Sequence, residues 1–65
     1  MPILPATILA GRSPQQKAAF ARAVTAAAVE HLGVPAAAVR VLIHEIAADD
    51  WFTAGEPKSP PPGAS

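Results

Sequence analysis

The sequence predicts a small α/β protein: a single β-α-β unit with a parallel strand pair, followed by a short C-terminal strand or hairpin. Three observations support this fold class. Residues 2–9 form an apolar, strand-like run, residues 14–32 carry the signals of a capped helix, and residues 39–46 are rich in β-branched side chains. Two strands that flank a helix normally pair in parallel through a right-handed crossover, which places the three segments in one unit.

The first strand is expected over residues 2–9, where apolar side chains alternate weakly before Ala10 and Gly11. Pro5 lies inside this run and has no N–H to donate. Its nitrogen is therefore expected at an unpaired edge or a bulge. Gly11 and Arg12 form the turn into the helix.

Both ends of the helix are marked in the sequence. Ser13 is a typical N-cap, Pro14 suits the first helical position, and Gln16 completes a capping box. Gly33 is expected as a left-handed cap after the helix ends near residue 32. An apolar stripe at helical spacing is predicted to face the sheet. Its members are Phe20, Val24, Ala27, Ala28, His31 and Leu32.

Residues 39–46 are predicted to form the second strand, which exposes two different faces. The face toward the helix carries Val39, Val41 and Ile43, and the opposite face carries Arg40, Leu42, His44 and Ile46. A two-stranded sheet with a half-apolar second face is not stable alone in water, so that face is expected to meet another subunit.

The C-terminal part is read as a polar turn at 47–50 and a short strand or hairpin that begins at Trp51. We divide the chain into a domain over residues 1–56 and a Pro-rich tail over residues 57–65, which its composition predicts to be disordered.

Size and composition predict an oligomer. The chain has 65 residues, of which 51% are hydrophobic and 15% charged, and it has no cysteine. A domain this small buries only about 60% of the surface of its unfolded chain. With no disulfide to compensate, the apolar surface is expected to be covered by other subunits.

Charge and hydropathy exclude two classes of partner. The formal net charge is zero, whereas a nucleic-acid-binding protein normally carries a basic stripe. No basic leader with an apolar core, and no apolar run long enough to span a bilayer, is present in the sequence. A cytoplasmic protein that binds neither nucleic acid nor membrane is therefore expected.

Pro2 is the most distinctive chemical group of the sequence. Removal of Met1 by an aminopeptidase would leave Pro2 with a free secondary amine, whereas every other proline nitrogen is locked in an amide. This amine would lead directly into the first strand, which would hold it rigidly. Taken alone, Met1-Pro2-Ile3 is read more simply as a proline tolerated at the start of a strand.

Two arginines are candidate ligands for an anion. Arg12 precedes the helix N-terminus, where a guanidinium and first-turn N–H groups suit a carboxylate or phosphate; a solvated turn arginine is the simpler alternative. Arg40 interrupts an apolar strand face and needs a partner or a site. Two simpler explanations for Arg40 are that its side chain reaches the sheet edge, or that it pairs with Glu45 or Asp49 of a neighbouring subunit.

Other candidate groups carry less information. Trp51 and Phe52 point to opposite faces of a strand, so at most one of them lines a given pocket, and packing is the simpler role for both. His44 and Glu45 lack the remaining spacing of a zinc motif. No metal site, nucleophilic triad or phosphate-binding loop is assigned.

Together these residues resemble the tautomerase superfamily, specifically its short 4-oxalocrotonate tautomerase type. The resemblance is collinear over residues 2–52. It rests on Met-Pro-Ile at the start, Gly-Arg-Ser before the helix, Gln-Lys in its first turn, and Val-Arg-Val-Leu-Ile-His-Glu followed by an aromatic residue. The turn Thr53-Ala54-Gly55 has one glycine where the family is glycine-rich, and the Pro-rich tail also departs from the common pattern.

The resemblance implies a cofactor-independent isomerase that assembles as a homohexamer. In this family, Pro2 without Met1 would be the general base, and Arg12 would bind a substrate carboxylate. Arg40 of a neighbouring subunit would bind the 2-oxo and carboxylate end of the substrate and support catalysis. Trp51 matches the pocket aromatic by ungapped counting, with Phe52 as the alternative one residue away.

The implied reaction moves a proton along a small unsaturated 2-oxo or 2-hydroxy carboxylate. A terminal amine has a reference pKa of about 8, and two arginines with an apolar wall would lower the pKa of the Pro2 amine toward neutrality. Two alternatives remain open. One is haloacrylate hydration, dehalogenation or decarboxylation with Pro2 as the acid, and the other is a non-catalytic packing module that retains Met1.

Overall fold

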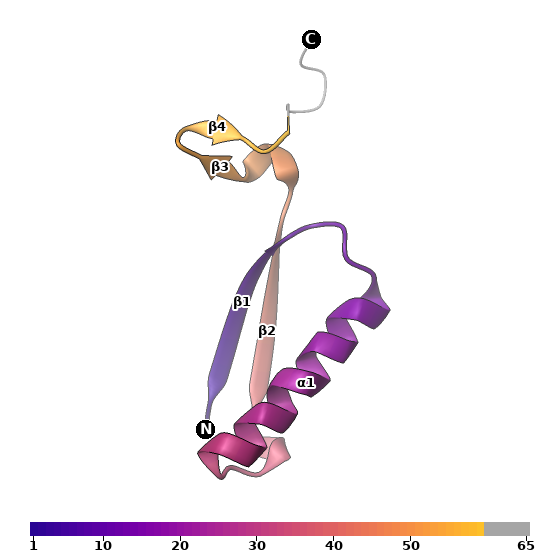
Figure 1. The fold of residues 1–65 in the computed structure, drawn as a ribbon, viewed down its shortest axis with the longest axis vertical. Coiled ribbons are helices and arrows are strands. Elements are labelled where there is room, and N and C mark those ends of the chain that lie inside the picture. The colour runs from indigo at the N-terminus through magenta and orange to yellow at the C-terminus, as the bar shows by residue number, and fades with distance from the viewer. Residues whose placement is uncertain (60–65) are drawn as a thin grey trace.

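A computed structural model describes residues 1–59 and has the predicted β-α-β order followed by a hairpin (Figure 1). Its elements are β1 (Ile3–Leu9), α1 (Pro14–Leu32), a 3-10 helix η1 (Ala36–Ala38), β2 (Arg40–Ile46), a 3-10 helix η2 (Ala48–Asp50), β3 (Phe52–Thr53) and β4 (Glu56–Pro57). The molecule is thin, with extents of 51 × 25 × 13 Å, because one helix covers one two-stranded sheet.

The two long strands pair in parallel, as predicted, with the register running from Ile3 opposite Arg40 to Leu9 opposite Ile46. Hydrogen bonds extend the ladder beyond both ends. The Arg40 N–H donates to the Pro2 carbonyl at 3.0 Å, and the Ala10 N–H donates to the Ile46 carbonyl at 2.8 Å. Alternate residues of β1 direct their N–H groups toward β2. Pro5 lies an odd number of residues from Ala10, so its nitrogen faces the outer edge, as expected.

The predicted ends of α1 are confirmed. The Gln16 N–H donates to Ser13 Oγ at 3.1 Å, and the Ser13 N–H donates to Gln16 Oε1 at 2.9 Å, which completes the capping box. Gly33 adopts the left-handed conformation with φ 67°, and its N–H donates to the Val29 carbonyl at 3.2 Å. Among residues 1–59, no helix has enough apolar length to cross a membrane.

The face of α1 that contacts the sheet differs in part from the predicted stripe. Val24 and Ala28 face the sheet, and Ala28 is buried. Phe20 and Leu32, in contrast, are 46% and 62% exposed, and the side chain of His31 is 73% exposed. The less exposed helical positions are Lys17, Ala21, Val24, Thr25 and Ala28. The prediction is confirmed for Val24 and Ala28 and wrong for Phe20, His31 and Leu32, because the sheet is contacted mainly by smaller side chains of the helix.

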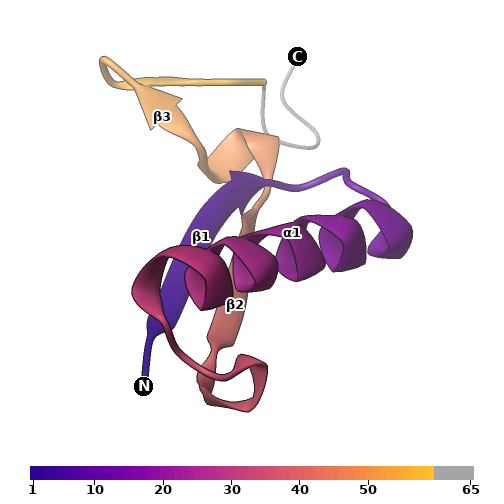
Figure 2. The same cartoon turned by 60° about the horizontal axis from the view of Figure 1, so that its bottom comes forward.

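The sheet has one covered and one open face. Figure 2 shows α1 lying across one face of both strands. Leu4, Ala6 and Ile8 of β1 are less exposed than the residues that alternate with them at positions 3, 5 and 7. The open face has no covering element among residues 1–59. It carries Ile3, Pro5, Thr7 and Leu9 from β1, and Arg40, Leu42, His44 and Ile46 from β2. Ile3 and Leu42 are 59% and 46% exposed. A large apolar area of this kind marks a surface that associates with another protein surface.

The C-terminal hairpin forms despite its single turn glycine. Phe52 pairs with Pro57 and Thr53 with Glu56, so the turn residues are Ala54 and Gly55. Both turn residues have positive φ, at 55° and 83°, as a type I′ turn requires.

The expected tail over residues 57–65 begins within the hairpin. Pro57 belongs to β4, the Lys58 N–H donates to the Trp51 carbonyl at 2.8 Å, and the Ser59 N–H donates to the Ala48 carbonyl at 3.3 Å. The remainder of that segment lies outside the described residues.

Replacing Ala54 is expected to raise or lower stability according to how well the new residue tolerates the left-handed backbone conformation of this position. The Ala54→Asn variant should raise the free energy of unfolding by about 0.5–1 kcal/mol, because Asn tolerates the left-handed region better than Ala does. The Ala54→Val variant should lower it by about 1 kcal/mol, because a β-branched residue fits that region poorly. Thermal unfolding at fixed subunit concentration measures both. Equal midpoints for the two variants would contradict the assigned turn.

Candidate active site

The predicted site residues lie at opposite ends of the β1–β2 pair. Pro2 and Arg40 lie where the two strands begin, while Arg12 follows the end of β1 and Trp51 follows the end of β2. At about 3.3 Å per residue, the length of β1 separates the two ends by roughly 23 Å. This separation follows directly from the parallel pairing, which brings both strand starts to one end.

Pro2 is held at the start of the sheet by its own backbone. Its carbonyl accepts the 3.0 Å hydrogen bond from the Arg40 N–H, and its side chain is half-buried. Met1, in contrast, is 82% exposed. While Met1 is attached, the Pro2 nitrogen is an amide and is not a base. The group that would become the amine on removal of Met1 is therefore already fixed next to Arg40.

The Arg40 guanidinium is positioned by backbone carbonyls. Its Nη1 donates to the Ala37 carbonyl at 2.7 Å and more weakly to the Val39 carbonyl at 3.4 Å. No carboxylate lies within ion-pair distance of it among residues 1–59. A guanidinium has five N–H donors, so most of them remain available to an anion. The side chain is thus oriented by the turn at η1.

Arg12 lies in a cavity of about 430 Å³ at the other end of the sheet. The residues that line it with Arg12 are Ile8, Leu9, Gln16, Lys17, Phe20 and Ile43. Arg12 forms no ion pair with any described residue. The combination of a free guanidinium and apolar walls suits a small organic carboxylate.

Sequence reasoning missed the apolar wall of this cavity. The sequence pattern assigns Phe20 to the helix–sheet contact and Leu9 only to the first strand. Their closeness to the turn at Arg12 in the sequence is the signal that points to a shared site.

A Lys17–Glu45 ion pair lies beside the Arg12 cavity. Lys17 Nζ is 2.7 Å from Glu45 Oε1, and the two side chains are 27% and 36% exposed. The pair connects the first turn of α1 to the end of β2. It also shows that Glu45 has a partner within its own chain.

The two aromatic candidates occupy different environments. Trp51 is half-buried between η2 and β3, while Phe52 is 59% exposed on the hairpin. Neither residue lines the Arg12 cavity or lies at the Pro2 end of its own chain. An aromatic wall near Pro2 would therefore come from a different chain.

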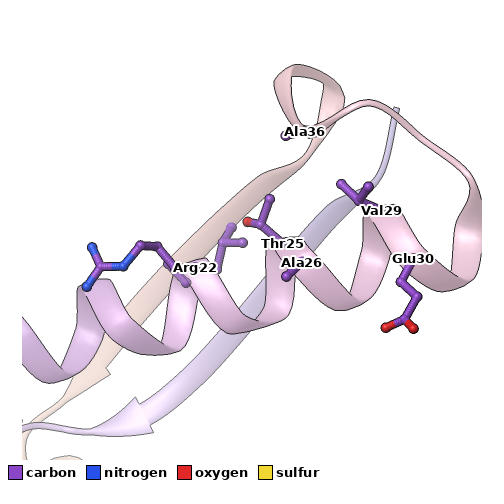
Figure 3. Close-up of a pocket in the computed structure, with 8 residues that line it drawn as sticks. Arg22, Thr25, Ala26, Val29, Glu30 and Ala36 are labelled. Carbon is purple, nitrogen blue, oxygen red and sulfur yellow. The ribbon is translucent and has the colours of Figure 1, made fainter.

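A second, open groove of about 620 Å³ lies between α1 and the η1–β2 segment (Figure 3). Its walls are mostly small residues, including Thr25, Ala26 and Ala36. Figure 3 shows that the side chains of Arg22 and Glu30 point away from Ala36. None of the predicted site residues lines this groove.

The geometry divides the candidate site into two halves. One half contains Pro2 and Arg40, and the other contains Arg12 with its apolar cavity and the nearby aromatic residues. A site that contains both Pro2 and Arg12 must take them from different chains, because the strand length separates them within one chain.

Comparison with known proteins gives a consistent result over nearly the whole chain. The family model described as "Tautomerase enzyme" matches residues 2–60. A probable tautomerase of Ralstonia nicotianae is 46% identical over 59 residues, which cover 91% of this chain and 84% of that protein. The 2-hydroxymuconate tautomerase of Comamonas testosteroni is 46% identical over 55 residues, which cover 85% of this chain and 87% of that protein.

Solved structures of tautomerases are also similar to this chain in both sequence and fold. TomN, a 4-oxalocrotonate tautomerase homologue in the tomaymycin biosynthetic pathway, is 47% identical over 88% of both chains with a TM-score of 0.84. A heterohexameric 4-oxalocrotonate tautomerase from Chloroflexus aurantiacus is 43% identical, with a TM-score of 0.83 over 89% of this chain and 94% of that one.

Proposed function

This chain belongs to the tautomerase family and is an isomerase of the 4-oxalocrotonate tautomerase type, and we propose that its substrate is a small unsaturated 2-oxo or 2-hydroxy carboxylate. The observation that carries this proposal is the 3.0 Å hydrogen bond between the Arg40 N–H and the Pro2 carbonyl. This bond fixes the backbone of the residue that would carry the terminal amine. At the same end of the sheet, the Arg40 guanidinium has no carboxylate partner among residues 1–59.

In the proposed reaction, Pro2 is the general base after Met1 is removed. The 82% exposure of Met1 makes it accessible to an aminopeptidase, and the small proline ring permits cleavage. The freed amine takes a proton from the carbon or hydroxyl oxygen at one end of the conjugated system. It returns the proton at the other end, so no atom is gained or lost.

The two arginines have complementary roles in this mechanism. Arg12 binds a carboxylate of the substrate in its apolar cavity. Arg40 binds the 2-oxo and carboxylate end and stabilises the negative charge that develops on the dienolate oxygen. Both cations also favour the neutral form of the Pro2 amine, because like charge disfavours the ammonium. Trp51, or Phe52 beside it, supplies the apolar wall.

We propose that the site is assembled from several chains, in a homohexamer. The outer edge of β1 is unpaired among the described residues, and Pro5 requires no donor there. Antiparallel pairing of two β1 edges about a two-fold axis would place Pro2 of one chain beside Leu9 and Arg12 of the other. The open sheet face would be covered by further subunits.

The haloacrylate and decarboxylation alternatives receive less support from the side chains. Water-adding chemistry normally needs a carboxylate to activate the water, and Glu45 is the candidate that the sequence offers. Glu45 is ion-paired to Lys17 at 2.7 Å on the helix-facing side of the sheet. That partner occupies one of the two carboxylate oxygens.

Intact mass and a spectroscopic assay together test the proposed function. The purified protein should lack the mass of one methionine, and it should ketonise 2-hydroxymuconate or phenylenolpyruvate, as followed by ultraviolet absorbance. A protein that retains Met1 and is inactive on both compounds would support the packing-module alternative instead.

The assembly predicts the effect of a charge on the open sheet face. Leu42→Lys should reduce the mass in solution from that of a hexamer to that of a dimer or monomer, and tautomerase activity should fall with it, because a desolvated cation opposes burial of this face. Analytical ultracentrifugation measures the assembly. Ala23→Lys, on the exposed outer side of α1, is the matched control and should leave both unchanged. A hexameric Leu42→Lys protein would place the interface elsewhere.

A further inference from the structure

The connection that carries Arg12 is attached to the end of β2 on both of its sides. Before Arg12, the Ala10 N–H donates to the Ile46 carbonyl at 2.8 Å. After Arg12, Lys17 Nζ binds Glu45 Oε1 at 2.7 Å. Glu45 and Ile46 are consecutive residues of β2. Ile46 therefore holds the chain before Arg12 through a main-chain hydrogen bond, and Glu45 holds the chain after it through an ion pair with the Lys17 side chain.

Glu45 is also an acidic group beside the Arg12 cavity. It lies in register with Ile8, which lines that cavity together with Arg12 and Lys17. Of these two cations, Lys17 is paired with the carboxylate, whereas Arg12 has no ion-pair partner among residues 1–59. If Lys17 were absent, Glu45 would become an unpaired carboxylate at the edge of the cavity that holds the unpaired Arg12 guanidinium.

We propose that Lys17 is a positioning residue that holds Glu45 and thereby keeps Arg12 free to bind the substrate carboxylate. The inference rests on the proposed role of Arg12 as the carboxylate ligand. It assigns the Lys17–Glu45 pair to the site rather than to the stability of the fold. About a third of each side chain is exposed, and ion pairs with that exposure contribute little to folding stability.

The proposal predicts an asymmetric response to removal of the two partners. Lys17→Met should raise the KM for 2-hydroxymuconate and the Kd for the non-reacting dicarboxylate adipate about fivefold, with kcat changed less than about twofold. Glu45→Gln should leave both constants unchanged or lower them, because it removes the competing carboxylate. The double variant should return to within about twofold of the wild-type values.

The experiment uses the assembled full-length protein, with steady-state kinetics and calorimetric titration of adipate. Arg22→Met, which removes another cation of the same helix outside the Arg12 cavity, is the matched control and should behave as wild type. Lys17→Arg should retain wild-type constants. A purely structural pair would make Glu45→Gln as damaging as Lys17→Met and would leave the double variant unrescued, which would overturn the inference.

The adipate titration separates this inference from the proposed function. A wild-type protein that binds adipate through Arg12 but does not turn over 2-hydroxymuconate would contradict the proposed substrate, while the asymmetry between Lys17→Met and Glu45→Gln would still support the positioning role. Adipate binding that is absent, or that Arg12→Ala leaves unchanged, would overturn the positioning role itself.

Discussion

An amino-terminal extension that keeps the Pro2 nitrogen in an amide will lower the tautomerase kcat about a thousandfold or more, because proton transfer by a positioned base contributes roughly two to four orders of magnitude. An amide nitrogen neither accepts nor returns a proton under these conditions. The rest of the site would be intact, since the Pro2 carbonyl can still accept the hydrogen bond from Arg40. The loss is therefore expected in kcat more than in KM.

The experiment has an internal control in the same polypeptide. A cleavable extension that a protease removes immediately before Pro2 should restore activity to the trimmed protein. An extension of the same length after Ser65 should have no effect on turnover. Mass spectrometry reports the state of the terminus in each sample, and equal rates before and after trimming would rule out the Pro2 amine as the base.

Replacing either arginine is expected to lower kcat/KM by about two to three orders of magnitude, because in the proposed mechanism each guanidinium stabilises charge on the substrate. The loss for Arg40→Ala should fall mainly on kcat, since Arg40 is assigned to the dienolate oxygen. The loss for Arg12→Ala should fall more on KM. Steady-state kinetics with 2-hydroxymuconate separate the two effects.

The separation of the two arginines within a chain allows a complementation experiment. Arg12→Ala and Arg40→Ala chains that are unfolded together in equal amounts and refolded should recover activity. Random mixing gives roughly a quarter of sites with both arginines intact, because each is supplied by a different chain. The same proteins mixed without unfolding are the control. No recovery in verified mixed oligomers would mean that one site does not draw its arginines from two chains.

Much of the fold is readable from local sequence signals. The capping box at Ser13 and the left-handed Gly33 set the ends of α1 within the sequence itself, and β-branched residues mark β2. The parallel pairing of the two strands then follows from the β-α-β connection. These signals are reliable because each depends on residues that are close together in the chain.

The side of α1 that faces the sheet, and the side-chain contacts of the candidate site, could not be predicted from local sequence signals. Seven of the 19 residues of α1 are alanines, and they lie on several sides of the helix. Its hydrophobic pattern therefore does not distinguish the side that Ala21 and Thr25 turn toward the sheet from the side that exposes Phe20. The Lys17–Glu45 pair joins residues far apart in the chain. The bond from Arg40 to the Ala37 carbonyl depends on the backbone path of η1. Such contacts are fixed by the packed chain and not by local pattern.

The half-sites at the two ends of the strand pair have a consequence for how the enzyme becomes active. A solitary chain that has lost Met1 would carry every group of the proposed site and perform no chemistry. Specific activity would consequently rise with protein concentration and fall on dilution below the dissociation constant of the assembly. Substitutions far from any reactive group would then reduce turnover simply by lowering the fraction of chains that have found their neighbours.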